Sequence, residues 1–267
     1  MTKPDASPEA KAPASRRARV LAVTSGKGGV GKTFLSANLA AALAARGERV
    51  LVLDADLGLA NLDVVLNLYP KTTLHEVFSD KATLEDAIVD APGGFSVLLA
   101  GSGLVEYSRL TPELRTRLQD VIETLSPRFD RILIDTGAGI SDVVLFSVSL
   151  ADEVLLVVTP EPTSMTDAYA TVKVLSTQQR REVIRLVVNQ TGRLGEARAI
   201  RGQLQRVVDH YVNSAAVQSL KLDLVGDIPT DAAVRESVQR RQLLLEVYPG
   251  STAAKAIGAL AARLAIP

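Results

Sequence analysis

The segment from Val20 to Thr33, VLAVTSGKGGVGKT, is the feature that most constrains what this chain can fold into. An apolar, β-branched run stops at a glycine-rich loop, and a helical pattern from Thr33 to Ala45 follows. The loop fits G-x-x-x-x-G-K-[ST] through Gly26, Gly31, Lys32 and Thr33. A strand, such a loop and a helix in this order form the context that a phosphate-binding loop requires. The alternative, a chance glycine loop, is disfavoured by the full match in that context.

The composition of this loop suits phosphate chemistry. Glycines let the backbone turn tightly with its N–H groups inward, and the following helix points its positive end at the same place. Lys32 is then expected to neutralise the β- and γ-phosphates, and the Thr33 hydroxyl is placed to ligate Mg²⁺. The residues expected to contact the nucleotide here are Gly26, Lys27, Gly28, Gly29, Val30, Gly31, Lys32, Thr33 and Phe34.

Two aspartates, Asp54 and Asp56, follow the second expected strand, Arg49 to Leu53. Carboxylates at i and i+2 can point to one side where a strand gives way to a loop, and open α/β sheets hold ligands at this edge. Because phosphoryl transfer depends on positioning and electrostatics, we predict that Asp56 orients the attacking water and that Asp54 lies nearer the magnesium shell. The alternative is a pair that only solubilises a turn.

A third carboxylate, Asp135, follows the apolar run from Arg131 to Ile134 and precedes a glycine-containing loop that extends to Ile140. This arrangement is typical of a Walker B aspartate at a strand tip, followed by a loop that senses the γ-phosphate. An aspartate after an apolar run is common by itself. Together with the phosphate-binding loop, however, the pattern indicates a Walker B aspartate.

Two further strand ends extend the expected site. The apolar run from Ile184 to Val188 ends at Asn189, whose amide can both donate and accept and could therefore pair with an adenine edge. Another run, Leu224 to Ile228, ends at Pro229. Because asparagine is also favoured in turns, a simple turn residue is the alternative for Asn189.

Continuous apolar runs separated by helical patterns predict the fold. Strands are expected near residues 20–25, 49–53, 96–100, 130–135, 153–158, 184–189 and 221–226. Such runs indicate burial on both faces, which favours an α/β, doubly wound and mainly parallel sheet flanked by helices. We expect Gly47 to cap the first helix. Residues 19–267 are expected to form one domain, and residues 1–18, which lack bulky apolar side chains, a disordered tail.

Composition excludes several classes of protein. The chain has no cysteine, which excludes disulfides, thiolate metal sites and iron–sulfur clusters. Thirty basic and thirty acidic side chains cancel, so no global field favours nucleic acid or an anionic membrane. No apolar run approaches the roughly 18 residues of a membrane span, and the polar N-terminus does not match a signal peptide. We therefore expect a cytoplasmic protein.

The loop sequence K-G-G-V-G-K-T contains a second lysine, Lys27, for which no phosphate is evident within its own protomer. This loop, and nearly the whole length of the chain, resembles the MinD/ParA family of deviant Walker A ATPases. The resemblance implies an ATP- and ADP-binding, Mg²⁺-dependent ATPase that forms a homodimer with ATP, and it implies that Lys27 reaches the ATP of the partner. It also implies that Asp56 in switch I handles the attacking water and that Asn189 and Pro229 surround the adenine. The expected catalytic residues are then Lys27, Lys32 and Asp56, and the expected metal residues are Thr33, Asp54 and Asp135, with both aspartates acting through water.

Three segments narrow the resemblance to the FlhG group of this family, also called FleN. They are LDADLGLANLD (residues 53–63), TPEPTSMTDAYATVKVL (159–175) and GDIPTDAAVRESVQRRQLLLEVYPGSTAAKAI (226–257). The resemblance implies control of flagellar number and placement through a FleQ-type transcription activator. The D-Q-A-x-x-L-R element through which such proteins stimulate the GTPase FlhF is missing from Met1 to Arg19, so stimulation of FlhF stays open.

Two segments allow alternative interpretations. The segment with Glu161, Thr163, Ser164 and Asp167 fits a dimer face, and it fits equally a helix N-terminus capped by Thr163. The final helical pattern, Thr252 to Leu264, carries one apolar stripe and few cations. Such a stripe more often docks on its own domain, so membrane contact at the inner membrane or a cell pole is expected to be weak.

Two rival functions stay open. The first is a ParA- or MinD-like positioning ATPase that acts on DNA, cell division or other cargo. Its DNA patch would be the arginines at 180, 181, 185, 193, 198, 201 and 206, although zero net charge makes ordinary surface residues the favoured interpretation. The second is a non-catalytic adaptor in which ATP is only a structural cofactor.

Overall fold

A computed structural model describes residues 17–57, 61–101, 109–213 and 219–266. In these residues a central sheet has eight strands in the order β3-β4-β2-β5-β1-β6-β7-β8, and all neighbouring pairs are parallel except β3 and β4. The strands are β1 (Arg19–Ser25), β2 (Val50–Ala55), β3 (Ile88–Ala91), β4 (Phe95–Leu98), β5 (Arg131–Ala138), β6 (Glu153–Val158), β7 (Val183–Thr191) and β8 (Lys221–Pro229). The expected doubly wound, mainly parallel α/β fold is confirmed.

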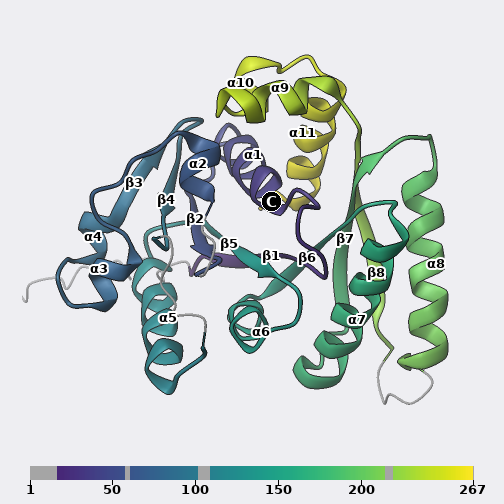
Figure 1. The fold of residues 1–267 in the computed structure, drawn as a ribbon, viewed down its shortest axis with the longest axis horizontal. Coiled ribbons are helices and arrows are strands. Elements are labelled where there is room, and N and C mark those ends of the chain that lie inside the picture. Colours follow the sequence, from purple (N-terminus) through teal and green to yellow (C-terminus); the bar gives the residue numbers. More distant parts are fainter. Residues whose placement is uncertain (1–16, 58–60, 102–108, 214–218, 267) are drawn as a thin grey trace, which may run out of the picture.

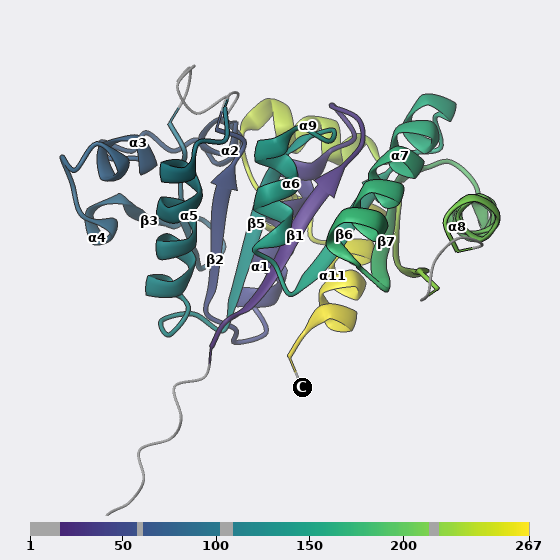
Figure 2. The same cartoon turned by 90° about the horizontal axis from the view of Figure 1, so that it is seen from below.

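Helices cover both faces of the sheet. They are α1 (Lys32–Ala44), α2 (Leu62–Leu66), α3 (Leu74–Phe78), α4 (Leu84–Ala87), α5 (Pro112–Leu125), α6 (Asp142–Ser149), α7 (Pro162–Gln179), α8 (Glu196–Tyr211), α9 (Ala232–Arg240), α10 (Leu244–Val247) and α11 (Thr252–Leu264). Figure 1 shows α1, α9, α10 and α11 above the sheet and α5, α6 and α7 below it. Seen from below, α5, α6 and α7 stand in front of the strands (Figure 2).

The continuous apolar runs form two cores, one on each face of the sheet. In β1, Leu21 and Val23 join the core under α1 and α11, whereas Val20 and Ala22 join the core under α5 to α8. Successive side chains of a strand point to opposite faces, so a strand buried on both sides must be apolar throughout. This is the physical reason why the sequence pattern predicted the parallel sheet.

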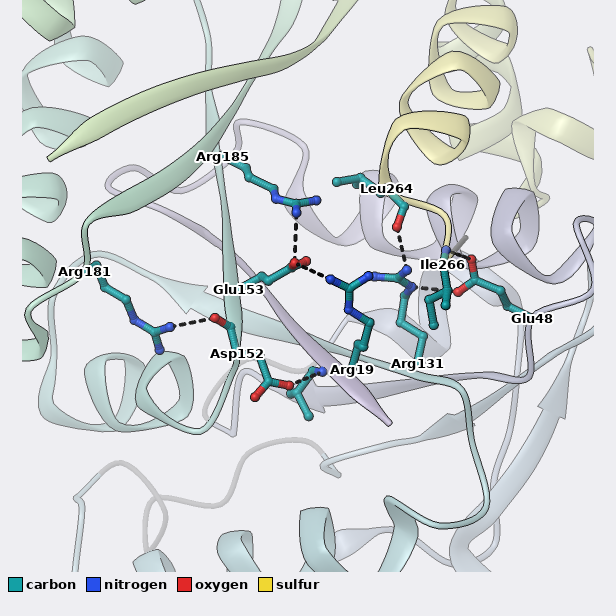
Figure 3. A network of polar contacts seen from close by, with 10 residues as sticks. Arg19, Glu48, Arg131, Asp152, Glu153, Arg181, Arg185, Leu264 and Ile266 are labelled. Carbon is teal, nitrogen blue, oxygen red and sulfur yellow. Dashed lines mark hydrogen bonds and ion pairs between the residues drawn. The ribbon is translucent and has the colours of Figure 1, made fainter. Parts of the chain in front are cut away.

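Polar contacts at the amino-terminal edge of the sheet fix the end of α11, the last helix (Figure 3). Arg131, which is fully buried, donates to Glu48 at 2.8 Å and to the carbonyl of Leu264 at 2.5 Å. The backbone N–H of Ile266 donates to the second oxygen of Glu48 at 3.1 Å. The apolar stripe of α11, formed by Ile257, Leu260 and Leu264, is buried against the domain. The stripe therefore docks on its own domain, as the sequence pattern favoured.

Several local expectations need correction. The cap of α1 is Ala45, and Gly47 instead takes a positive φ of 91° in the turn that follows. The antiparallel edge strand β3 was missed, because its four residues include the exposed Asp90 and form no continuous apolar run. The strand β5 continues past Asp135 to Ala138, so this aspartate lies inside the strand and not at its tip.

The expected domain boundary falls mostly on undescribed chain. Residues 1–16, on which the prediction of a disordered tail rests, lie outside the described residues. Ala18, the last residue assigned to that tail, is buried, and its N–H donates to the carbonyl of Ser126. No helix among the described residues is long and apolar enough to cross a membrane.

Candidate functional site

A cavity of about 880 Å³ opens at the carboxyl edge of the sheet. The loop between β1 and α1 lines it, together with residues at the ends of β2, β5, β7 and β8 and one side of α9. In open α/β sheets this edge, where the strand order reverses, is where ligands bind. The phosphate loop and the four strand ends that the sequence singled out therefore meet at this cavity.

Two glycines of the loop are required by close packing. A Cβ on Gly26 would lie 2.3 Å from the backbone carbonyl of Asp167 in α7, and a Cβ on Gly31 would lie 2.5 Å from the amide nitrogen of Asn189. Gly31 also has a φ of 93°, which side chains rarely adopt, and it is the residue before the first turn of α1. The loop is consequently held between α7 and the end of β7.

Lys32 is buried at the base of the loop, with 8% of its surface exposed. Its ammonium donates to the Ser25 hydroxyl at 2.9 Å, and that hydroxyl donates to the carbonyl of Lys27 at 2.7 Å. Burial lowers the pKa of Lys32, and the nearby carboxylates of Asp135 and Asp56 partly oppose this. A desolvated cation beside carboxylates gains a strong partner when a triphosphate enters.

Two carboxylates lie side by side beneath the loop. Asp54 of β2 and Asp135 of β5 are register partners, and both are buried. Burial, followed by the charge of Asp135, raises the pKa of Asp54 well above its usual value. Burial also raises the pKa of Asp135 to about 6. Hydrogen bonds from Thr33 and from Ser36, the second at 2.9 Å, lower this pKa and so oppose part of the shift. Because two buried carboxylates repel each other when both are ionised, a cation bound beside them would lower the cost of their charges.

The donor set around these acids fits Mg²⁺. One oxygen of Asp54, Oδ2, is buried without a hydrogen-bond partner among the described atoms, and a buried unpaired acceptor costs free energy unless a ligand satisfies it. Among the described residues no group of three or more His, Cys, Asp or Glu side chains forms a metal cage. Mg²⁺ suits such a partial site, because it is usually held by one or two carboxylates, waters and substrate phosphates.

Asp56, the predicted water-orienting residue, lies in the segment after β2 and lines the cavity. Its N–H donates to Asp54 at 3.1 Å. A Cβ on Gly137 would approach its Oδ1 to 3.4 Å, so the segment with Asp56 and the end of β5 contact one another. The neighbouring residues 58–60 of this predicted switch lie outside the described chain.

The second lysine, Lys27, is not among the residues that line the cavity in this structure. Its ammonium donates to Glu161 at 2.5 Å and to the Thr163 hydroxyl at 2.9 Å, both at the start of α7. The expectation that Thr163 caps this helix is wrong: the cap position is Glu161, which makes no side-chain capping bond. The sequence singled out these residues, but their contact with Lys27 was not foreseen.

The end of β7 joins the loop through Asn189. Its amide nitrogen donates to the carbonyl of Val30 at 2.8 Å, and its amide oxygen accepts from the N–H of Gln190 at 2.9 Å. Pro229 and Phe34 also line the cavity. Sequence reasoning missed Ser25 and Ser36, the hydroxyl partners of Lys32 and Asp135. Ser36 could have been found as the residue one helical turn after Thr33.

Comparisons with known proteins agree with this geometry. The family model described as "AAA domain" matches residues 18–187. The antiactivator FleN of Pseudomonas aeruginosa is 42% identical over 92% of this chain and 86% of its own length, and the flagellum site-determining protein YlxH of Helicobacter pylori is 32% identical over 92% and 81%. The solved septum site-determining protein MinD of Pyrococcus horikoshii, complexed with Mg-ADP, superposes with a TM-score of 0.76 at 29% identity, covering 92% of this chain and 96% of that one.

The fold and the phosphate loop thus define a P-loop nucleotide-binding ATPase. The chain belongs to the AAA-domain family, in its MinD/ParA branch, and within that branch it is similar to FleN along nearly its whole length. It therefore binds ATP and ADP, as that branch does.

Proposed function

We propose that this chain is a regulatory ATPase that limits flagellar number by switching between a monomer and an ATP-bound dimer. The observation that carries the proposal is the phosphate loop with two lysines in a chain that is 42% identical to an antiactivator over 92% of its length. The partner we propose is a flagellar transcription activator of the FleQ type. FlhF is a second candidate partner, and the site of action is the cytoplasm or the cell pole.

In this proposal the residues at the cavity have separate roles in binding and hydrolysing ATP. Lys32 neutralises the β- and γ-phosphates against the backbone N–H groups of the loop, and its tie to Ser25 keeps it in place. Asp56 accepts a hydrogen bond from the attacking water and orients it toward the γ-phosphate, a task that requires position more than basicity. Asn189 and Pro229 lie beside the base, and Phe34 lines the cavity near the loop.

Thr33, Asp54 and Asp135 are the residues that would hold Mg²⁺, the aspartates through water. The ion supplies positive charge that offsets the charge developing on the phosphates. Ser36 keeps Asp135 oriented by donating to its Oδ1. Burial of both aspartates keeps bulk water away from this charge, which strengthens the electrostatic contacts there.

Lys27 gives the switch its dependence on ATP. In the dimer it would leave Glu161 and contact the triphosphate of the partner, so that ATP binds the dimer more tightly than the monomer. A ligand shifts an equilibrium only through such a difference in affinity. Hydrolysis removes the γ-phosphate, and Lys27 then loses the contact across the interface that favours the dimer.

The experiment combines a molecular and a cellular readout. With a nonhydrolysable ATP analogue, sedimentation should show a dimer for the wild type and a monomer for Lys27→Ala, while both bind the analogue. In cells that lack the gene, the wild type should restore normal flagellar number by electron microscopy and Lys27→Ala should not. A normal dimer for Lys27→Ala, or normal flagellar number without the gene, contradicts the proposal.

A positioning function on DNA is the second candidate, and contacts of the arginines count against it. Arg181 donates to the backbone carbonyls of Val148, Ala151 and Asp152, and Arg185 pairs with Glu153 at 2.8 Å. Arg201 donates to the carbonyl of Leu222 at 2.9 Å. Three of the seven arginines thus make hydrogen bonds or ion pairs within the domain. A gel shift at low and high salt with ATP would reveal any remaining phosphate-driven binding.

A further inference from the structure

The strand β8 lies at one edge of the sheet, and in the described part of the chain it pairs with β7 on one side only. The N–H of Lys221 donates to the carbonyl of Glu182, directly before β7, so Lys221 faces the neighbouring strand. Because backbone groups alternate in direction along a strand, those of Leu220 and Leu222 point outward. Such an edge is a template on which another chain can add a strand.

Side chains from α8 and the residues after it occupy this edge where a neighbouring strand would lie (Figure 1). The Gln205 amide accepts from the N–H of Leu222 at 2.8 Å and donates to the carbonyl of Leu220 at 3.0 Å. Arg201 donates to the carbonyl of Leu222 at 2.9 Å. Asn213 accepts from the N–H of Leu220 at 2.7 Å and donates to its carbonyl at 3.1 Å. The outward N–H and carbonyl groups of both leucines are thus bound by side chains.

The spacing of these side chains explains how a helix can follow a strand edge. Arg201, Gln205, Asp209 and Asn213, which we call the edge ladder, recur every four residues, and this spacing places helical residues on one side. Asp209 joins the ladder by accepting from Gln205 at 2.8 Å and from Asn213 at 2.7 Å. The residues directly before the first three members of the ladder are apolar and buried against the domain: Ile200, Leu204 and Val208. Packing of that apolar row therefore holds the ladder over the edge of β8.

Two further features protect the same edge. Arg263 of α11, on the other face of the sheet, donates to the carbonyl of Val225 at 3.1 Å, at a residue that the register with β7 skips. Lys221 and Asp223 are exposed charged residues of β8. Bulges and charged side chains are known means of keeping edge strands from pairing. The ladder is thus the main part of a larger protective arrangement.

We propose that the edge ladder closes β8 against pairing with a second copy of this chain. Without it, two copies could place their β8 strands antiparallel about a two-fold axis, because the free groups of Leu220 in one copy would match those of Leu222 in the other. The ladder keeps the nucleotide-free chain monomeric. This inference goes beyond the proposed ATP switch and does not depend on it, although a dimer formed through β8 would bypass the need for ATP.

The test is sedimentation of the full chain without nucleotide, for the wild type and three double variants. Arg201→Ala with Gln205→Ala opens the edge, and its self-association constant should rise at least about tenfold, as for a net gain of one or two hydrogen bonds. Arg201→Lys with Gln205→Lys also removes the amide but keeps charge over the edge, so it should stay monomeric. Arg198→Ala with Gln203→Ala removes the same residue types from exposed positions of α8 and should behave as the wild type.

A cross-link locates the contact, because the chain has no cysteine of its own. In the antiparallel pairing Lys221 would face its counterpart in the second copy at a Cα separation of about 4.5 Å, which a disulfide can bridge. Mild oxidation should therefore link Lys221→Cys chains that also carry the two alanine substitutions, and should leave Lys221→Cys alone monomeric.

Four results would overturn the proposal: a monomeric alanine variant, equal association of the lysine variant, association without the cross-link, or a wild type that associates without nucleotide. A wild type that is monomeric without nucleotide and also fails to dimerise with an ATP analogue would contradict the proposed switch and leave the closed edge intact.

Discussion

Removing the contact that keeps Lys27 in its own protomer should strengthen the ATP dimer. Lys27 donates to Glu161 at 2.5 Å and to Thr163 at 2.9 Å, and this contact must break before the lysine can reach a neighbouring nucleotide. The substitution Glu161→Gln keeps the size of the side chain and removes its charge. The monomer then loses a stabilising ion pair that the dimer, in the proposed mechanism, does not contain.

The size of the effect follows from the exposure of the pair. The side chains of Lys27 and Glu161 are 35% and 58% exposed, so solvent screens their attraction, and exposed pairs of this kind contribute about 0.2–1 kcal/mol. A dimer breaks two such pairs, one in each protomer. The dissociation constant should therefore fall about 2- to 30-fold, since about 1.4 kcal/mol corresponds to a factor of ten. Added salt should reduce the difference.

Analytical ultracentrifugation over a range of protein concentrations, with a nonhydrolysable ATP analogue, measures this constant. Glu123→Gln is a matched control, because it makes the same change of charge on α5, which is separated from α7 by α6 (Figure 2). An effect of Glu161→Gln that is no larger than that of Glu123→Gln, or a weaker dimer, would refute the reasoning. In the second case Glu161 itself would stabilise the interface.

Three further predictions concern the cavity. Lys32→Ala should weaken ATP binding at least about 30-fold by calorimetry, because a buried phosphate charge loses its partner; retained tight binding would contradict the assignment. Asp56→Ala should slow steady-state phosphate release about 100-fold with ATP affinity nearly unchanged, and undiminished turnover would exclude its role. Asp135→Asn should stabilise the nucleotide-free protein above pH 6 by about 1–3 kcal/mol, because a pKa raised to about 6 means that ionisation costs folding free energy. This gain should disappear as the pH falls through 6 toward 4, where the wild-type carboxyl is protonated in the folded state, and a pH-independent difference in urea unfolding would show that the ionisation of Asp135 does not matter.

Much of the fold and part of the site could be predicted from local patterns. The phosphate loop was recognisable because its glycines, Lys32 and Thr33 are contiguous, and seven of the strands were recognisable because burial on both faces requires continuous apolar runs. The edge strand β3 was missed because it is only partly buried and its apolar run is broken by the exposed Asp90. The end of β5 was placed too early because its last residues, Thr136 to Ala138, are not apolar enough to extend the run.

The sequence by itself determined the parallel sheet, the phosphate loop and which residues stand at the strand ends, because each depends on neighbours along the chain. Only the tertiary structure decided what those residues touch. Lys27 contacts Glu161, 134 positions away, and Asn189 contacts Val30, 159 positions away. The adjacency of Asp54 and Asp135 depends on strand register. Register is set by the packing of the whole sheet, and no local pattern in the sequence records it.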